Sequence, residues 1–314
     1  MTTQPILSVD TSTLIAGVAR GSIVVELAIS TYSGRKQDKR TQAEVTASKG
    51  ANSKRAASVY KSLFADCKEL DDILKFQARV RQTHYKLTQP WNDFGARLLP
   101  TSLLIDYKAD MNRLEAEFQA LVTKFLDKYD TLVSAAAFQL GTLFDRTEYP
   151  LREEVERKFS LSVGYSPLPT SGDFRLDLEH EVQIEMAQRY EAQAQARLAS
   201  AAQDSWTRLH TALTRLSDRL TVDVREDGSP KKRMFHDTMV NGAVDLCDLL
   251  KHMNIMGDAA LEKARVQLEG ALAGVTPKDL RDSEGQRTIT KQKVDAILDA
   301  FDWGSDADSS ETAE

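Results

Sequence analysis

The chain has 314 residues, of which 41% are hydrophobic and 28% are charged, and its formal net charge is −6 at pH 7. The length is sufficient for one large domain or two modest ones. The negative charge argues against a surface that coats nucleic acid or anionic lipid uniformly. No stretch approaches the ~18 apolar residues of a membrane span. The first residues, MTTQPILSVDTS, also lack the basic start and apolar run of a signal peptide. We therefore expect a cytoplasmic protein with no membrane partner.

The first part of the chain, residues 1–105, predicts an α+β region. Residues 23–33, IVVELAISTYS, are rich in β-branched side chains between two glycines, which is typical of a strand. The preceding stretch, TSTLIAGVARG, fits either a short helix or another strand. Residues 54–87 predict a helix, because apolar residues recur at steps of three and four: Tyr60, Leu63, Cys67, Leu70 and Leu74.

Residues 35–61 form a basic block within this region. They include eight Lys or Arg and two acidic residues, so the net charge is 8 − 2 = +6. The middle, VTASKGANSK, is typical of an exposed, mobile loop. Such a loop can contact nucleic-acid phosphates without sequence preference, and the flanking Tyr32 and Tyr60 can stack on bases. The alternative is a solvated loop that balances an acidic body. The candidate phosphate contacts are Arg35, Lys36, Lys39, Arg40, Lys54 and Arg55.

The stretch THYKLTQPWNDFGARLLP, residues 83–100, predicts a structural joint between two helices. A proline disfavours helical geometry in the residue before it, so the helix from residue 54 ends near Pro90. The Asn-Asp pair and the glycine that follow favour a turn. We expect Trp91 and Phe94, beside Pro90, to act as wedges at this corner, and Thr101 or Asp106 to cap the next helix. A substrate site at the same residues is the alternative.

Two long helical segments follow. Residues 106–144 carry apolar side chains at steps of three or four, with neither Gly nor Pro before Gly141. Residues 178–222 are alanine-rich in the middle and heptad-like at the end. We expect them to pair as an antiparallel, coiled-coil-like hairpin over residues 106–224.

An excursion at residues 145–177 separates these two segments. It predicts a short helix that starts near Pro150, a strand at 159–165 and a Pro-rich turn. We expect this strand to pair with the strand at 23–33, because each alone would leave its edge groups unpaired.

The last part, residues 225–303, predicts a helical region after the linker REDGSPKKR. Phe235, Met239, Leu246, Leu250 and Met253 share one apolar face. One helix begins at Thr276-Pro277 with Asp279 as the reciprocal acid, and Thr290 is the expected cap of the last helix. Residues 304–314, GSDADSSETAE, carry acidic charges only and predict a disordered tail. The fold class is therefore mainly α (α+β).

Chemical motifs are absent from this sequence. A phosphate-binding loop needs a Gly-Lys pair, which the chain lacks, and none of the five histidines forms a metal-binding spacing. Cys67 and Cys247 lie in apolar helical stretches, which favours buried free thiols over a disulfide or a nucleophile. We expect no catalytic residue, no metal and no cofactor, and therefore a protein that is not an enzyme.

Three segments together resemble a known family. They are ISTYSGRK, THYKLTQPWNDFGARLLP and LGTLFDRTEYPLREEVERKFSLSVGYSPLPTSGDFRLDL. Their order and spacing resemble an uncharacterised family of bacteriophage and prophage proteins over residues 20–220. The most specific elements are Pro-Trp, Glu148-Tyr149-Pro150 and the Pro-x-Pro stretch before Asp-Phe-Arg. The family has no assigned activity, so the resemblance implies a phage setting in the host cytoplasm and no functional residues.

Two functions fit this sequence. The first is a non-enzymatic, oligomeric phage protein that binds nucleic acid through the basic block during replication, recombination or genome handling. The second is a structural or adaptor module. It would assemble through its long helices with itself or with a phage-encoded ATPase or replication protein.

Overall fold

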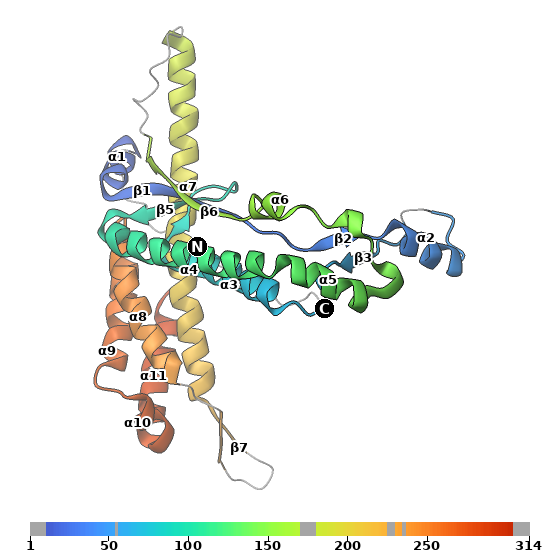
Figure 1. Cartoon of the computed structure of the whole chain (residues 1–314). Coiled ribbons are helices and arrows are strands. Elements are labelled where there is room, and N and C mark those ends of the chain that lie inside the picture. Colours follow the sequence, from blue (N-terminus) through green and yellow to red (C-terminus); the bar gives the residue numbers. More distant parts are fainter. Residues whose placement is uncertain (1–10, 54–55, 170–179, 225–229, 234–236, 304–314) are drawn as a thin grey trace. The chain divides into compact units, whose positions relative to one another are not determined.

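The computed structural model describes residues 11–53, 56–169, 180–224, 230–233 and 237–303 (Figure 1). Helices dominate these residues, and a small β-sheet accompanies them, so the predicted fold class is confirmed. The predicted acidic tail, Lys54, Arg55 and Phe235 lie outside the described residues.

The chain divides into two compact units. Unit one takes the described residues of 1–25, 87–104 and 165–314, and unit two takes those of 26–86 and 105–164. Two strands, β1 (Ser22–Ser30) and β6 (Ser160–Pro167), cross the boundary along the chain. The boundaries of these two units therefore differ from those of the expected domains at 1–105, 106–224 and 225–303.

Unit two contains two short strands, five helices and two 3₁₀ turns. They are β2 (Arg35–Gln37), α2 (Lys39–Ser48), β3 (Tyr60–Ser62), α3 (Lys68–Leu87), α4 (Leu104–Asp127), α5 (Tyr129–Leu140), η2 (Gly141–Leu143), η3 (Arg146–Glu148) and α6 (Arg152–Glu156).

Unit one is built around one long helix. Its elements are α1 (Thr11–Gly21), β4 (Gln89–Pro90), β5 (Ala96–Pro100), η1 (Thr101–Leu103), α7 (His180–Leu220), β7 (Val222–Val224), β8 (Pro230–Lys232), α8 (Asp237–Met253), α9 (Ala259–Leu272), α10 (Pro277–Asp282) and α11 (Glu284–Ala300). The stretch before β1, which fitted helix or strand, is therefore the helix α1.

The main sheet has the strand order β4-β5-β1-β6. The predicted pairing of the strand near residue 23 with the strand near residue 160 is confirmed, since β1 is hydrogen-bonded to β6. Strands β4 and β5 form an antiparallel hairpin in which Gln89 lies opposite Leu98 and Pro90 opposite Arg97.

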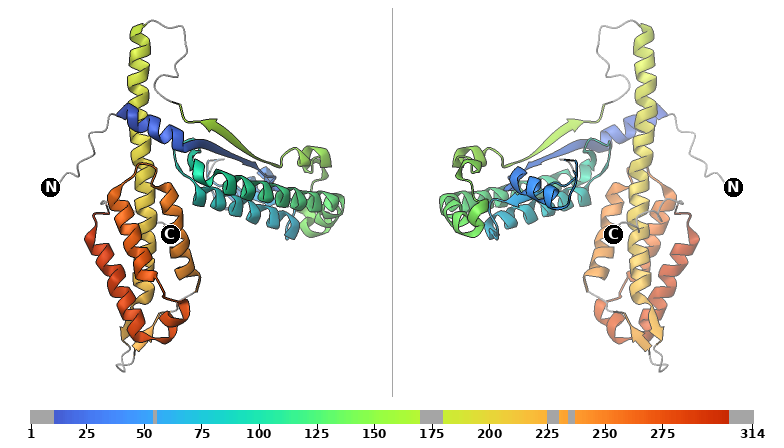
Figure 2. Two further views of the ribbon diagram at one scale, coloured as in Figure 1. Left: turned by 90° about the vertical axis from the view of Figure 1, so that its left-hand side faces the viewer. Right: turned by 90° about the vertical axis from the view of Figure 1, so that its right-hand side faces the viewer.

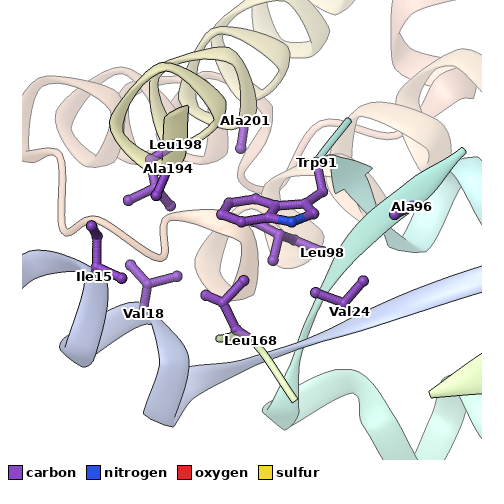
Figure 3. Close-up of a cluster of buried hydrophobic side chains, with 10 residues drawn as sticks. All are labelled: Ile15, Val18, Val24, Trp91, Ala96, Leu98, Leu168, Ala194, Leu198 and Ala201. Carbon is purple, nitrogen blue, oxygen red and sulfur yellow. The ribbon is translucent and has the colours of Figure 1, made fainter. Parts of the chain in front are cut away.

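The core of unit one gathers around the middle of α7. Ala194 and Ala201 are fully buried, and their small side chains let α1 pack closely, with Ile15 and Val18 in the same cluster (Figure 3). The C-terminal half of α7 packs against α8, α9 and α11, the orange and red helices in Figure 2.

The end of α7 is fixed by a buried arginine. The guanidinium of Arg287 in α11 donates hydrogen bonds to the carbonyl oxygens of Arg219, Leu220 and Arg233, at 3.0 Å for Leu220. The last carbonyls of a helix have no intrahelical partner, so this cation satisfies them. Burial lowers the pKa of Arg287.

The helix caps of the C-terminal region are partly as predicted. The capping box of Thr276 and Asp279 opens α10 as expected. Thr290 does not cap the last helix, so that prediction is wrong. Helix α11 begins at Glu284, where Ser283 caps it by accepting a hydrogen bond from Gln286 N, and Thr290 is buried inside the helix. A single residue separates α10 from α11, so Ser283 serves both.

The helix predicted over residues 54–87 starts later. Tyr60 lies in β3, where it pairs with Gln37 of β2, and α3 begins only at Lys68. Its first turn holds Glu69 and Asp71, which suit the positive end of the helix dipole. Strand pairing with a distant segment therefore overrides a local helical period.

The helix predicted over residues 106–144 is divided into α4 and α5. At Lys128 the backbone N–H bonds to Phe125 O, three residues back, which tightens the chain locally. The apolar stripe nevertheless continues, since Phe125, Tyr129 and Val133 are all buried. The predicted packing face is confirmed, and the predicted continuity is wrong.

Helix α4 finds an antiparallel partner in α3. Phe76 stacks near Phe118, with ring centroids 6.5 Å apart, and the Glu69–Lys128 and Arg79–Glu117 pairs lie at 2.6 and 2.9 Å. The contacting residue numbers increase along α3 while they decrease along α4, so the two helices run in opposite directions.

The two arms of the expected 106–224 hairpin belong to different units: α4 and α5 to unit two, α7 to unit one.

Candidate nucleic-acid interface

The loop expected at VTASKGANSK begins inside a helix, since α2 extends to Ser48, whereas residues 49–53 contain no helix or strand, as expected. Residues 35–37 and 60–62 form the β2–β3 hairpin, and α2 belongs to the segment that connects the two strands along the chain (Figure 1). Asp38 begins α2: one carboxylate oxygen accepts hydrogen bonds from Arg40 N and Thr41 N at 3.1 Å, and the other accepts from the Thr41 hydroxyl at 2.8 Å. The bonds from Thr41 lower the pKa of Asp38.

The hairpin register sorts the basic side chains onto two faces. Arg35 pairs with Ser62, Lys36 with Lys61, and Gln37 with Tyr60. Because side chains alternate along a strand, Arg35 and Tyr60 share one face and Lys36 and Lys61 share the other. The sequence order Arg-Lys therefore does not place these two cations together.

The face of Lys36 and Lys61 meets acidic groups. Lys61 Nζ lies 2.6 Å from Glu148 Oε2 and donates to Leu143 O at 2.6 Å. Hydrogen bonds from Thr147 lower the pKa of Asp145, and the charges of Lys61 and Lys36 lower it further. The acidic groups on this side of the hairpin therefore lie on the face that Lys36 shares with Lys61.

The hairpin face of Arg35 and Tyr60, together with α2 and its C-cap, carries exposed basic side chains. We use the name α2 surface for five exposed side chains: Arg35, Lys39, Arg40, Lys49 and Tyr60. Helix α2 has no buried residue and no acidic residue in its first turn. Within the described chain, the recorded ion pair of this surface is the exposed Arg40–Glu44 pair at 3.4 Å. The N-terminus of α2 is already capped by the Asp38 carboxylate, so the exposed cations are the groups of this surface that attract anions.

The two tyrosines that flank the basic block differ in exposure. Tyr32 is 8% exposed and packs edge-on against Phe64, with ring centroids 6.3 Å apart. Burial raises the pKa of its hydroxyl well above the usual value. Tyr60 is 56% exposed. Only Tyr60 of this pair presents its ring to a ligand.

The predicted joint is a β-hairpin with one buried and one exposed ring. Trp91 is 5% exposed and packs in the unit one core, as Figure 3 shows, whereas Pro90 is partly buried in β4. Phe94 is 96% exposed, so its prediction as a wedge is wrong. Asn92 Oδ1 accepts hydrogen bonds from Phe94 N and Ala96 N at 3.0 Å, which places Phe94 in the turn.

The start of the next helix also differs from the prediction. The 3₁₀ turn η1 follows Pro100 and leads into α4 at Leu104, and no side-chain hydrogen bond caps η1. Neither Thr101 nor Asp106 is at the N-cap position. Thr101 instead donates from its hydroxyl to Gly21 O at 3.1 Å.

A buried polar network beside the joint was not predicted. Gln89 Nε2 donates to Ala201 O at 2.9 Å and to Ser205 Oγ at 2.8 Å, and both side chains are fully buried. Arg208 lies 2.7 Å from Asp204, whose pKa is raised by burial against the lowering effect of that arginine. The i, i+4 spacing of Asp204 and Arg208 is the sequence signal from which this ion pair could have been predicted. These bonds hold β4 on α7.

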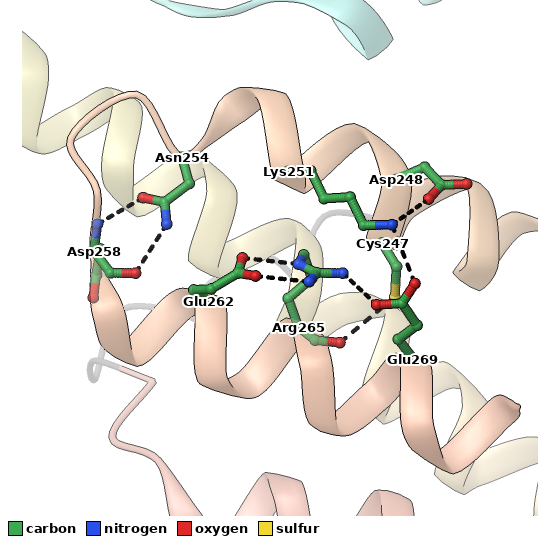
Figure 4. Close-up of polar contacts among 8 residues, drawn as sticks. All are labelled: Cys247, Asp248, Lys251, Asn254, Asp258, Glu262, Arg265 and Glu269. Carbon is green, nitrogen blue, oxygen red and sulfur yellow. Dashed lines mark hydrogen bonds and ion pairs between the residues drawn. The ribbon is translucent and has the colours of Figure 1, made fainter.

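A second polar cluster joins α8 and α9 (Figure 4). The Arg265 guanidinium donates to both carboxylate oxygens of Glu262 at 2.7 and 2.8 Å and to Glu269 at 2.7 Å. Lys251 of α8 bridges Glu269 at 3.1 Å and Asp248 at 2.8 Å. Each charge has an opposite partner, so the cluster is a structural staple.

The thiols fit the prediction of buried free cysteines. Burial raises the pKa of Cys247 to about 11 and also raises that of Cys67. Within the described ranges, no three His, Cys, Asp or Glu side chains gather in a way that would hold a metal ion.

No helix in the described part of the chain has the length and apolar character needed to cross a membrane. Comparisons with models of protein families, with curated proteins and with solved structures find no match to this chain. The resemblance to a phage family and the host cytoplasm therefore stay predictions.

Proposed function

We propose that this protein binds nucleic acid through the α2 surface, without catalysing a reaction. The observation that carries the proposal is the group of four exposed cations on β2, α2 and the C-cap of α2, in a chain of net charge −6. Arg35, Lys39, Arg40 and Lys49 would contact phosphates. Lys36 contributes less, because it lies on the opposite face of the hairpin from Arg35 and Tyr60.

The distribution of charge supports the same site. The sequence of unit two has 21 Lys or Arg and 18 Asp or Glu, a net charge of +3, whereas the whole chain carries −6. The remainder of the chain therefore carries −9. A local positive surface on an acidic protein confines binding of a polyanion to one place. Replication, recombination or genome handling in a phage-infected cell is the setting that the sequence resemblance implies.

A charge reversal in the first turn of α2 tests the proposal. The double variant Lys39→Glu, Arg40→Glu places acids where the helix dipole favours them, so the fold of α2 is preserved. We expect it to weaken binding to labelled DNA and RNA by at least about tenfold at about 50 mM salt, where phosphate contacts are strong. Fluorescence anisotropy measures this binding.

The matched control reverses two exposed lysines elsewhere in unit two. Lys75 on α3 and Lys108 on α4 are exposed, and the variant Lys75→Glu, Lys108→Glu has the same change of net charge. We expect it to retain most of the wild-type affinity. Failure of the wild-type protein to bind, or equal losses in the two double variants, would rule out the α2 surface as the site.

A second candidate function is assembly through the long helices, with another copy or with a phage-encoded ATPase. Exposed apolar side chains support it: Ile105 of α4 is 82% exposed and Phe138 of α5 is 91% exposed. Val182 and Ile184 are also exposed near the start of α7. Such residues favour contact with another protein when they lie together.

Light scattering tests this candidate. We expect the wild-type protein to have a mass above the 35.0 kDa of one chain. In the variant Phe138→Ser we expect the mass to fall toward that of a single chain. A wild-type protein that stays at the single-chain mass at high concentration, and retains no ATPase in a pull-down, would contradict it.

A further inference from the structure

Tyr60 is the exposed aromatic residue of the α2 surface. Its backbone pairs with Gln37 in the β2–β3 register. The next rung of the hairpin is closed by the hydrogen bond from Asp38 N to Val59 O at 2.9 Å. The backbone of Tyr60, and therefore the face from which its ring projects, is set by strand pairing, which is more precise than a position on a loop.

The ring of Tyr60 is not part of the aromatic core of unit two. That core centres on Phe64, whose ring lies 5.6 Å from Tyr129 and 5.4 Å from Tyr149, measured between centroids. The recorded ring contact of Tyr60 in the described chain is with Arg35, whose guanidinium carbon lies 5.6 Å from the ring centroid. With 56% of the residue exposed, the ring stabilises no hydrophobic core.

A ring and a cation on one face match the two parts of a nucleotide. An aromatic face stacks on a base of any sequence, and an adjacent cation contacts the backbone phosphate. Arg35 lies on the same hairpin face as Tyr60, and Lys39 and Arg40 follow directly in α2. Lys61, the strand neighbour of Tyr60, points to the opposite face and pairs with Glu148.

Base stacking also decides between single strands and duplexes. Bases within a duplex stack on one another and offer only their edges, whereas the bases of a single strand are free to stack on a protein ring. Building on the function proposed above, we infer that the α2 surface takes single-stranded nucleic acid, DNA or RNA, with one base stacked on Tyr60.

Three substitutions of Tyr60 test the inference by anisotropy with labelled single strands and the corresponding duplexes. Tyr60→Ala lowers the affinity for single strands about 5- to 150-fold, the range for loss of a base-stacking ring, and leaves duplex binding unchanged. Tyr60→Phe retains the affinity. Tyr60→Leu keeps apolar bulk without an aromatic face and behaves like Tyr60→Ala.

The control is Phe94→Ala, which removes an even more exposed ring from the other hairpin turn. We expect it to leave binding unchanged. Equal single-strand affinity in Tyr60→Ala and the wild type overturns the inference, and so does a wild-type preference for duplexes. The proposed function still stands in that case if the Lys39→Glu, Arg40→Glu variant loses binding, and both fail together if the wild type binds no nucleic acid.

Discussion

At the scale of single residues, Trp91 and Phe94 show that the same residue class can have opposite roles three positions apart. Trp91 packs against the buried face of α7, and the guanidinium of Arg197 lies 5.4 Å from its ring centroid. Phe94 extends from a turn that Asn92 closes. The sequence predicted the turn and the buried tryptophan, but turn residues alone do not show which side chain points inward.

This difference gives a stability prediction. Trp91→Ala should lower the free energy of unfolding by about 3–5 kcal/mol, as large truncations of buried aromatic residues do, and the melting temperature by several degrees. Phe94→Ala should change it by less than about 0.5 kcal/mol, because an exposed side chain loses little. Thermal and urea denaturation measure both. An unchanged melting temperature in Trp91→Ala, with lost nucleic-acid binding, would instead support a ligand site at the hairpin.

At the scale of elements, periodicity located the long helices but not all of their ends. The buried stripe of α4 and α5 follows the predicted steps, because packing against one neighbour requires a single face. The start of α3 depends on the pairing of β2 with β3. This pairing joins segments too far apart in the sequence for a local hydrophobic pattern to predict it. The basic block was therefore found from its charge, whereas its division into two faces required the hairpin register.

The staple between α8 and α9 gives a pH prediction. Hydrogen bonds from Arg265 lower the pKa of Glu262 and Glu269 below the ordinary value for glutamate. A carboxylate with a lowered pKa in the folded state stabilises the fold above its unfolded pKa, about 4.3 for Glu. That contribution is lost as pH falls through the lower folded pKa.

Urea denaturation of the variant Glu262→Gln across a pH series tests the staple. The loss of unfolding free energy relative to the wild type should be largest above about pH 5 and should shrink below about pH 4. Asp245→Asn, an exposed change on α8, should show no such dependence. A Glu262→Gln effect that is constant with pH would mean that the charge of the Glu262 carboxylate does not stabilise the fold.

At the scale of the whole molecule, the two compact units alternate along the chain. Residues 87–104 belong to unit one although α3 and α4, on either side, belong to unit two. Composition did not indicate this division, because it rests on contacts between segments far apart in sequence. It does separate the charge: the positive unit two carries the α2 surface and the negative remainder does not.

The measurement that tests the central claim most directly is the salt dependence of single-strand binding. Four phosphate contacts predict that log K falls with log salt concentration with a slope of about −3, at roughly 0.7 per contact on single strands. The Lys39→Glu, Arg40→Glu variant removes two of these contacts, so its slope should be about half as steep. Wild-type binding that is independent of salt, or an equal slope in the two proteins, would contradict phosphate recognition by the α2 surface.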